Sequence, residues 1–430
     1  MSGLFEDLKW RGLVHQVTDA EFVPGWLETG SRVVYAGFDP TADSLHVGSL
    51  LPLLMLRRFQ KAGHRPIALV GGATGMIGDP SGKSDERNLL SVEVLRHNVD
   101  CLAKQMSQFL DLTDGKAKLL NNFDWMGKFS YLEFLRDVGK HFPVNVMLAK
   151  DSVRSRIERD DAGISYTEFS YMLLQAYDFV HLSDQHACEL QIGGSDQWGN
   201  ITAGIDLGRR MRSRQLYGMT NPLLLKSDGS KMGKTEKGAI YLSAARTIPY
   251  HFYQYWINVA DADAGTCLRF LTELSREEIE SLDASRSEAP HKRESQKRLA
   301  EALTLLVHGE SGLTAARRAT DVFFGGEIQA DMTSEELLSI FSDVPSKAIA
   351  KSSLEGDGLA LTSALCEVKL SNSQGEARRS VEQGGVYVNN QKQSDIKAKL
   401  TTTSLIGGQF IVLRNGRRKY AILRLEDAPA

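Results

Sequence analysis

Lysines and glycines are concentrated in the segment "LKSDGSKMGKTEKGAIYL", which spans residues 225–242. Its lysines are Lys226, Lys231, Lys234 and Lys237, and they stand among small polar residues. A compact ammonium group on a flexible stem can follow a polyphosphate whose charge shifts during a reaction. The segment therefore indicates a mobile cationic loop that stabilises phosphate, although a solvated run of charges remains an open alternative.

A histidine and a glycine stand at the start of a predicted helix in the stretch from Tyr35 to Phe59. Asp43 or Ser44 could cap this helix, which would place His46 in its first turn, where backbone N–H groups and the helix dipole favour an anion. Gly48 has no side chain, so a flat group could lie against the helix backbone. Taken alone, the pattern fits phosphate binding or an ordinary helix histidine.

A third basic loop, "GDPSGKSDERN", contains Asp79, Lys83 and Arg87 and follows a second predicted strand. Farther along, "FSYMLLQAYDF" contains Tyr171, and Gln175 and Asp178 follow it at spacings of four and three. This spacing puts three polar side chains on one helix face, where they could enter one pocket. The alternative is a core tyrosine and a charge on the helix surface.

The elements that must position these residues are strands followed by helices. Residues 31–39 and 66–74 read as buried strands on either side of a helix at 44–63 that ends near Gly63, which makes a βαβ unit with a parallel sheet. A strand at 188–194 and a helix at 201–211 repeat the theme, so we expect a cleft between two halves. The tail shows alternating "GGVYVNN" and "GQFIVLRNG", typical of hairpins.

These patterns predict an α/β fold with a Rossmann-like parallel-sheet domain that carries the phosphate-binding loops, then an α-helical domain, then a small α+β C-terminal domain, and the resemblance described below implies nucleotide binding by the first and RNA binding by the last. The predicted boundaries are 1–245, 246–330, a polar linker at 331–353, and 354–430.

Composition limits the function classes. No run of about 18 apolar residues exists, and the start "MSGLFEDLKWRG" is too polar for a signal or transit peptide, so we expect a cytoplasmic protein without a membrane partner. The four cysteines lie far apart, so neither disulfides nor structural zinc is expected. Residues 350–430 hold twelve Lys and Arg against eight Asp and Glu, which suits a polyanion partner or a solvated surface.

The chain resembles bacterial tyrosyl-tRNA synthetases, class I enzymes with His-x-Gly-His and Lys-Met-Ser-Lys-Ser signatures. The resemblance covers nearly the whole length and includes "FDPTADSLH", "GGATGMIGDPSGK", "FSYMLLQAYDF" and "QIGGSDQWGN", with "HVGS" and "KMGKT" as the signatures. Ser49 departs from the second histidine, and Gly233 and Thr235 are milder variants. Because serine can still donate a hydrogen bond to a ribose oxygen, we expect altered nucleotide contacts and retained activity.

The resemblance implies that tyrosine is activated with ATP to tyrosyl-adenylate and pyrophosphate, and that the tyrosyl group then passes to the terminal adenosine of tRNA(Tyr). No covalent enzyme intermediate is implied, and Mg²⁺ would accompany ATP. The residues implied for catalysis are Thr41 and His46 at the γ-phosphate and Lys83, Arg87, Lys231 and Lys234 around pyrophosphate. Those implied for ATP binding are Gly37, Asp39, His46, Gly48 beside adenine, Ser49, Gly194 and Asp196 at the ribose, Lys231 and Lys234.

For L-tyrosine the resemblance implies a site with three parts. The residues are Tyr35 and Asp178 at the phenol, Tyr171, Gln175 and Asp79 at the ammonium, and Gln197 on the carboxylate side.

The tail segment "KLSNSQGEARRSVEQGGVYVNNQKQSD" resembles the small RNA-binding domain that bacterial members share with a ribosomal small-subunit protein. The RNA-binding residues expected there are Arg378, Arg379, Arg414, Arg417, Arg418 and Lys419. Residues 130–148, "SYLEFLRDVGKHFPVNVML", correspond to the family's dimer-forming insertion, so a homodimer is implied.

Two other interpretations stay open. One is a related nucleotidyl-transferring enzyme or the tryptophan-specific relative, against which the pair of Tyr35 and Asp178 argues for a phenol. The other is a catalytically idle RNA-binding protein, motivated by Ser49 and the basic tail, against which His46 and the lysine loop argue.

Overall fold

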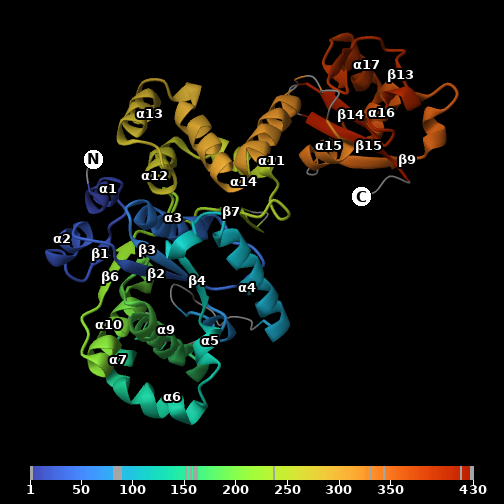
Figure 1. The fold of residues 1–430 in the computed structure, drawn as a ribbon. Coiled ribbons are helices and arrows are strands. Elements are labelled where there is room, and N and C mark those ends of the chain that lie inside the picture. Colours follow the sequence, from blue (N-terminus) through green and yellow to red (C-terminus); the bar gives the residue numbers. More distant parts are fainter. Residues whose placement is uncertain are drawn as a thin grey trace. The chain divides into compact units, whose positions relative to one another are not determined.

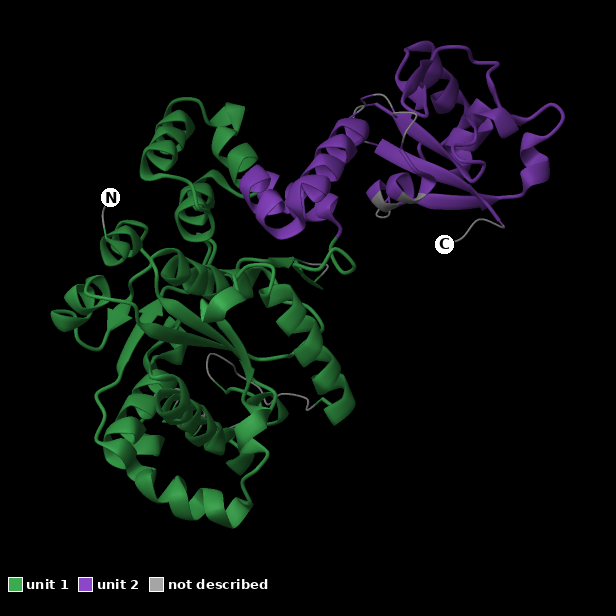
Figure 2. Cartoon of the chain, viewed as in Figure 1, with its two compact units in different colours: residues 1–247, 259–299 green, residues 248–258, 300–430 purple. Residues whose placement is uncertain are grey.

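The computed structural model describes residues 3–80, 90–150, 153–154, 157, 163–235, 238–324, 326, 328, 332–341, 344–416 and 419–426. The chain forms two compact units, one of residues 1–247 and 259–299 and the other of residues 248–258 and 300–430 (Figure 2). No helix within the described ranges is long and apolar enough to cross a membrane.

The first unit is built on a six-stranded sheet in the order β1-β6-β5-β2-β3-β4. Every neighbouring pair is parallel except β1 with β6. The strands are β1 (Gln16–Val17), β2 (Val33–Phe38), β3 (Arg65–Val70), β4 (Lys118–Asn121), β5 (Cys188–Gly194) and β6 (Tyr217–Asn221). Successive strands run outward from β2 on one side and from β5 on the other, so the chain order reverses between these two. Ligands bind at such a reversal in open parallel sheets.

Helices cover both faces of this sheet, which is why strands such as β2 and β6 are buried almost throughout. Figure 1 shows α3 (Val47–Lys61) and α4 (Val92–Met106) on one face and α9 (Tyr166–His186) and α10 (Trp198–Arg212) on the other. The predicted Rossmann-like parallel sheet is confirmed. The remaining helices of this unit are α1 (Leu4–Trp10), α2 (Phe22–Glu28), α5 (Phe123–Met126), α6 (Tyr131–Asp137), α7 (Val144–Leu148), α12 (Asp261–Leu271) and α13 (Arg276–Glu288).

Helix α3 begins later than the sequence suggested. His46 has an extended backbone and is the N-cap, so it precedes the first turn instead of lying in it. Ser44 does not cap the helix, because its Oγ accepts hydrogen bonds from Gln105 and from the backbone of Ser243. Asp43 pairs with Arg246. The helix ends at Lys61, which confirms the predicted end near Gly63.

The second unit contains α11 (Pro249–Ile257), most of α14 (Glu294–Phe323), α15 (Ser334–Ile340) and a five-stranded sheet in the order β12-β11-β14-β15-β9. The strands are β9 (Ser346–Ile349), β11 (Val386–Val388), β12 (Gln391–Gln393), β14 (Phe410–Asn415) and β15 (Lys419–Leu425). Helices α16 (Leu361–Glu367) and α17 (Gln374–Glu382) complete the tail, with the short pair β10 (Leu359–Ala360) and β13 (Lys399–Leu400). Hairpins β11–β12 and β14–β15 confirm the predicted hairpins.

Two apolar clusters lie on the two faces of this sheet. Ile411 and Leu413 belong to the cluster that contains α16 and α17, whereas Phe410 and Val412 belong to the cluster that contains parts of α14 and α15. Strict alternation along β14 produces this division, since successive side chains of a strand point to opposite faces.

The polar segment 331–353 differs from the linker that its composition suggested. It carries α15, whose Leu337 and Ile340 are buried, and β9, which pairs in parallel with β15. The apolar side chains are few but spaced to form one helix face, and strand pairing over more than 70 residues of sequence is invisible to a local reading. Helix α15 and strand β9 therefore belong to the tail's own fold.

Candidate active site

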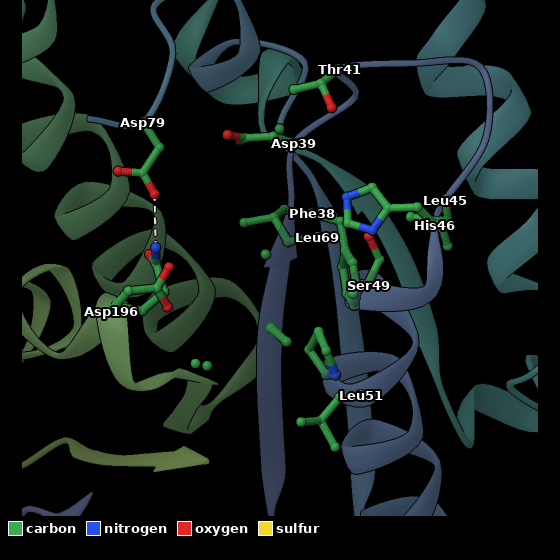
Figure 3. Close-up of a pocket in the computed structure, with 18 of the residues that line it drawn as sticks. Phe38, Asp39, Thr41, Leu45, His46, Ser49, Leu51, Leu69, Asp79 and Asp196 are labelled. Carbon is green, nitrogen blue, oxygen red and sulfur yellow. Dashed lines mark hydrogen bonds between the residues drawn. The ribbon is translucent and has the colours of Figure 1, made fainter. Parts of the chain in front are cut away.

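A cavity of about 750 Å³ lies in the first unit, at the carboxyl ends of β2 and β5 and the start of α3. Figure 3 shows Asp39, Thr41, His46 and Ser49 on one side of it and Asp79 and Asp196 on the other. The predicted catalytic and substrate residues that line it are Tyr35, Gly37, Asp39, Thr41, His46, Gly48, Ser49, Asp79, Tyr171, Gln175, Asp178, Gly194, Asp196, Gln197, Lys231 and Lys234. Lys83, Arg87 and Lys237 lie outside the described residues.

The start of α3 forms one wall of the cavity. A Cβ at Gly48 would lie 2.8 Å from Cε1 of His46, so the imidazole itself occupies the space that glycine leaves. Burial lowers the pKa of His46, and the charges of Lys234 and Lys231 lower it further, while a hydrogen bond to its own backbone opposes the shift. His46 is therefore a neutral hydrogen-bonding group beside two cations near neutral pH.

The lysine loop is attached to the start of α3 by backbone hydrogen bonds. Val47 N donates to Ile240 O at 3.0 Å, and Ile240 N donates to Gly233 O at 2.8 Å. Gly233 has φ +82°, and a Cβ there would lie 2.7 Å from Cβ of Val47. A side chain is excluded by both conformation and space, so this variant of the signature has a structural reason.

The deepest part of the cavity is aromatic and carries one carboxylate. Tyr35 on β2 is 1% exposed, and its hydroxyl has no hydrogen-bond partner among the described residues. Asp178 on α9 is 2% exposed and accepts hydrogen bonds from Asn122 Nδ2 at 2.9 Å and Trp125 Nε1 at 2.8 Å. A buried hydroxyl without a partner costs free energy unless a ligand supplies one.

Burial dominates the titration of this pair. It raises the pKa of Asp178 to about 7, against the hydrogen bonds from Asn122 and Trp125, which lower it. Burial and the nearby charge of Asp178 both raise the pKa of Tyr35 well above its ordinary value, so Tyr35 stays a hydroxyl. The pair thus offers a donor and an acceptor side by side.

A chain of amides and carboxylates forms the opposite wall. Gln175 Nε2 donates to Gln197 Oε1 at 3.2 Å. Gln197 Nε2 donates to Asp79 Oδ2 at 2.7 Å, the bond drawn as a dashed line at Asp79 in Figure 3. Tyr171 donates to Asp39 Oδ1 at 3.4 Å. The resemblance assigned Gln197 to the carboxylate side of the tyrosine and Asp79 to its ammonium group. In the structure the two side chains are in direct contact.

Asp196 lies beside this wall. Burial and the charge of Asp79 raise its pKa, and Lys231 lowers it. A Cβ at Gly194 would lie 2.6 Å from Oδ1 of Asp196, so the glycine is needed for the carboxylate to reach the cavity.

Sequence reasoning missed Asn122, Gln191 and Asn221, which line the cavity, and Trp125, which acts on it through its hydrogen bond to Asp178. The Oε1 of Gln191 and the Oδ1 of Asn221 are buried without a partner within the described part of the chain. Gln191 stands inside the apolar strand β5 and Asn221 ends the buried strand β6, which was an available signal. Asn122 and Trp125 have no such signal, because their role depends on contact with a helix more than 50 residues away.

The predicted RNA-binding residues do not form one group. Arg378 and Arg379 are exposed on α17, and Lys419 is exposed at the start of β15. Arg414 is only 6% exposed, and its guanidinium lies 3.7 Å from the ring centroid of Tyr387. Its assignment as an RNA contact is therefore not supported by its position. Arg417 and Arg418 lie outside the described residues.

The segment 130–148 exposes apolar side chains. Tyr131 is 63%, Leu132 75% and Val144 59% exposed. Large apolar residues grouped on one surface typically mark an interface.

Comparisons with known proteins give consistent matches. Residues 28–325 match the family described as tRNA synthetases class I (W and Y), and residues 336–423 match the tyrosine–tRNA ligase SYY-like C-terminal domain. The tyrosine–tRNA ligase of Rhodopirellula baltica is 60% identical over 427 residues, which are 99% of this chain and 97% of the relative. That of Roseiflexus castenholzii is 51% identical and covers 99% of this chain and 100% of the relative.

Solved structures agree with these matches. A C-terminally truncated mitochondrial tyrosyl-tRNA synthetase from Aspergillus nidulans has a TM-score of 0.65 and 30% identity, over 74% of this chain and 92% of that one. A tyrosyl-tRNA synthetase from Archaeoglobus fulgidus, at 18% identity and a TM-score of 0.55, covers 73% of this chain and 100% of that one and shows the shared fold.

Proposed function

We propose, since this chain belongs to the tyrosine–tRNA ligases among the class I tRNA synthetases, that the cavity of the first unit is where it joins L-tyrosine to ATP. The observation that carries the proposal is the buried pair of Tyr35 and Asp178 at the base of the cavity. A phenol bound there accepts a hydrogen bond from the Tyr35 hydroxyl and donates one to the Asp178 carboxylate. Phenylalanine would leave the buried Tyr35 hydroxyl without a partner and would give Asp178 no hydrogen bond beyond those from Asn122 and Trp125.

The polar wall suits the amino-acid end of the substrate. Asp79 supplies negative charge for the ammonium group, and Gln197 holds Asp79 in place through its amide. Tyr171 and Gln175 stand on the same face of α9 as Asp178, so one helix spans the length of the substrate. The Oε1 of Gln175, which has no partner within the described chain, is a further acceptor for the ammonium.

ATP fits the wall that the start of α3 forms and the mouth of the cavity. Lys231 and Lys234 bring positive charge there and His46 brings a neutral imidazole. The tyrosine carboxylate attacks the α-phosphate directly, so the protein contributes charge stabilisation and alignment and no nucleophile. We assign Thr41 with His46 to the γ-phosphate. Asp39, Gly37, Gly48, Ser49, Gly194 and Asp196 are assigned to the nucleoside side.

Within the described residues, no three His, Cys, Asp or Glu side chains are grouped to hold a metal ion. Mg²⁺ that accompanies ATP would then be held largely by phosphate oxygens and water, its usual environment with nucleotides. It would supply charge neutralisation at the phosphates.

We further propose that the exposed apolar segment 130–148 joins two copies of the chain and that the exposed Arg378 and Arg379 contact the phosphates of tRNA(Tyr). A cytoplasmic location remains a prediction from the sequence.

The test is ATP–pyrophosphate exchange with each of the twenty amino acids. Exchange should depend on tyrosine, and Tyr35→Phe should narrow the preference for tyrosine over phenylalanine by about 1–3 kcal/mol, because one buried hydrogen bond is lost. Exchange that tryptophan supports better than tyrosine would contradict the proposal, as would unchanged discrimination in Tyr35→Phe.

A further inference from the structure

The tip of the β11–β12 hairpin contacts the end of α14 within the second unit. Asn390 Nδ2 donates to Val322 O at 2.7 Å and to Gly326 O at 2.9 Å. Val322 lies in the last turn of α14, where backbone carbonyls have no partner inside the helix. The bond to Val322 caps α14, and the bond to Gly326 ties the same buried side chain to the backbone just beyond the helix.

A second side chain completes this contact. The Tyr420 hydroxyl lies 3.3 Å from Asn390 Oδ1 and 3.3 Å from Val322 O, so it supports the asparagine and reaches the same carbonyl. Arg414 covers the Tyr387 ring at 3.7 Å and lies 5.7 Å from the centroid of Tyr420. These contacts explain why a basic residue of the tail is buried.

The backbone of Asn390 is suited to this role. It has φ +61°, a left-handed conformation that asparagine tolerates better than most residues. Phe323 of α14 stacks on Tyr420 with ring centroids 5.1 Å apart, and Val322 is buried in the apolar cluster that α14 and α15 form with one face of the sheet. The hydrogen bonds are therefore shielded from water, which makes their loss costly.

We propose that Asn390, Tyr420 and Arg414 form a latch that holds the tail domain in one orientation against α14, and that the latch positions the exposed Arg378 and Arg379 of α17 for tRNA. The inference rests on the proposed function, because tRNA is the ligand whose binding it organises. Asn390, Tyr420 and Arg414 are positioning residues and make no contact with RNA. Arg378 and Arg379 are the contacts.

Positioning and contact residues should differ in their response to salt. Each phosphate contact that is lost lowers the slope of log affinity against log salt by about 1. Loosening the latch removes no phosphate contact, so the slope stays unchanged while the KM for tRNA rises with the fraction of molecules in other orientations. Loss of two buried hydrogen bonds should raise this KM on the order of tenfold.

The test uses the full-length chain with Asn390→Gly, which removes the amide but keeps the left-handed backbone accessible. The matched control is Asn389→Gly. Asn389 also has positive φ, +51°, but its side chain bonds Ser404 O and Val412 N inside the tail. Three quantities are measured: pyrophosphate exchange, tRNA charging across a salt series, and hydrogen exchange in the last turn of α14.

We expect Asn390→Gly to raise the KM for tRNA about tenfold, with unchanged kcat at saturating tRNA, unchanged pyrophosphate exchange and an unchanged salt slope. Hydrogen exchange at residues 320–324 should accelerate several-fold in Asn390→Gly and not in Asn389→Gly. Arg378→Ala should instead lower the slope by about 1.

An unchanged KM with unchanged hydrogen exchange would overturn the latch, and a reduced slope in Asn390→Gly would make Asn390 an RNA contact. If Asn390→Gly fails to fold, Tyr420→Phe decides the question, because it removes only the hydroxyl and keeps the ring in the core. If the unsubstituted protein shows no tyrosine-dependent pyrophosphate exchange, the proposed function is refuted. The comparison of amide hydrogen exchange between Asn390→Gly and Asn389→Gly still tests the latch in that case.

Discussion

Tyrosine affinity should fall as the pH drops below about 7, because Asp178 must be ionised to accept the phenol. Both oxygens of Asp178 already face donors, Asn122 and Trp125, so a proton on either oxygen displaces one of those bonds. Burial raises the pKa of Asp178 to about 7. The ionised fraction is then about 0.9 at pH 8 and about 0.1 at pH 6, so the apparent Kd should rise about tenfold.

The same raised pKa sets the pH dependence of stability in the ligand-free protein. Asp178 contributes to the free energy of unfolding through this raised pKa. The contribution is fully present below the ordinary pKa of 3.8 and is lost as the pH rises through about 7. The difference between these values corresponds to roughly 4 kcal/mol as an upper limit. Asp178→Asn removes this cost. The new amide, however, must turn its NH2 group toward one of the two donors, Asn122 or Trp125. Asn122 cannot rotate to offer an acceptor instead, because its Oδ1 accepts a hydrogen bond from Ala73 N.

That mismatch costs about 1–3 kcal/mol, less than the charge penalty that is removed. Asp178→Asn should therefore be more stable to denaturant than the natural chain at pH 8 by about 1–3 kcal/mol, while binding tyrosine more weakly and without pH dependence.

The assay is equilibrium tyrosine binding from pH 5.5 to 8.5, with unfolding measured at the same pH values. Asp206→Asn is the matched control, since Asp206 is a carboxylate outside the cavity, paired with Arg209 and Arg210. A Kd for tyrosine that does not change with pH in the natural chain would refute the reasoning. So would a change in Kd near pH 7 that persists in Asp178→Asn.

The remaining predictions concern the phosphate end of the cavity and use pyrophosphate exchange together with the Kd for tyrosine. Lys231→Ala should slow exchange by orders of magnitude with the Kd nearly unchanged, and a large loss of tyrosine affinity would place Lys231 elsewhere. Gly233→Ala should impair exchange much more than Gly229→Ala, because both glycines have φ near +80° but only Gly233 lacks room for a Cβ; equal effects would exclude the clash. His46→Ala should slow exchange more than Ser49→Ala, and the reverse order would contradict the assigned roles.

The strand and helix pattern was sufficient to predict where the site lies. Tyr35 lies within the buried strand β2 and Gly194 ends β5, and the carboxyl ends of parallel strands meet at one edge of a sheet. The start of α3 was placed in the right region but two or three residues early, because capping depends on which side chains are already bonded to other segments. Ser44 is already bonded to Gln105, so it was not available as a cap.

The contacts around Asp178 could not be predicted in the same way. A local reading identifies a carboxylate on a helix, but its pKa depends on burial and on donors that come from the chain after β4. Asn122 and Trp125 are ordinary residues in their own segment. Their importance arises only when the sheet and α9 are assembled, so a property as central as the ionisation of the phenol site is a tertiary effect.

The tail shows how a composition-based boundary can mislead an experiment. A chain stopped near Pro345, inside the expected linker, would keep α15 but lose the sheet on which it packs. Phe341 and Leu337 are buried against that sheet and would become exposed. Weak charging by such a fragment would then mix a lost RNA surface with a damaged core. Substitution of Arg378 and Arg379, which are exposed and carry no buried contact in the tail, isolates the contribution of phosphate contacts to tRNA binding.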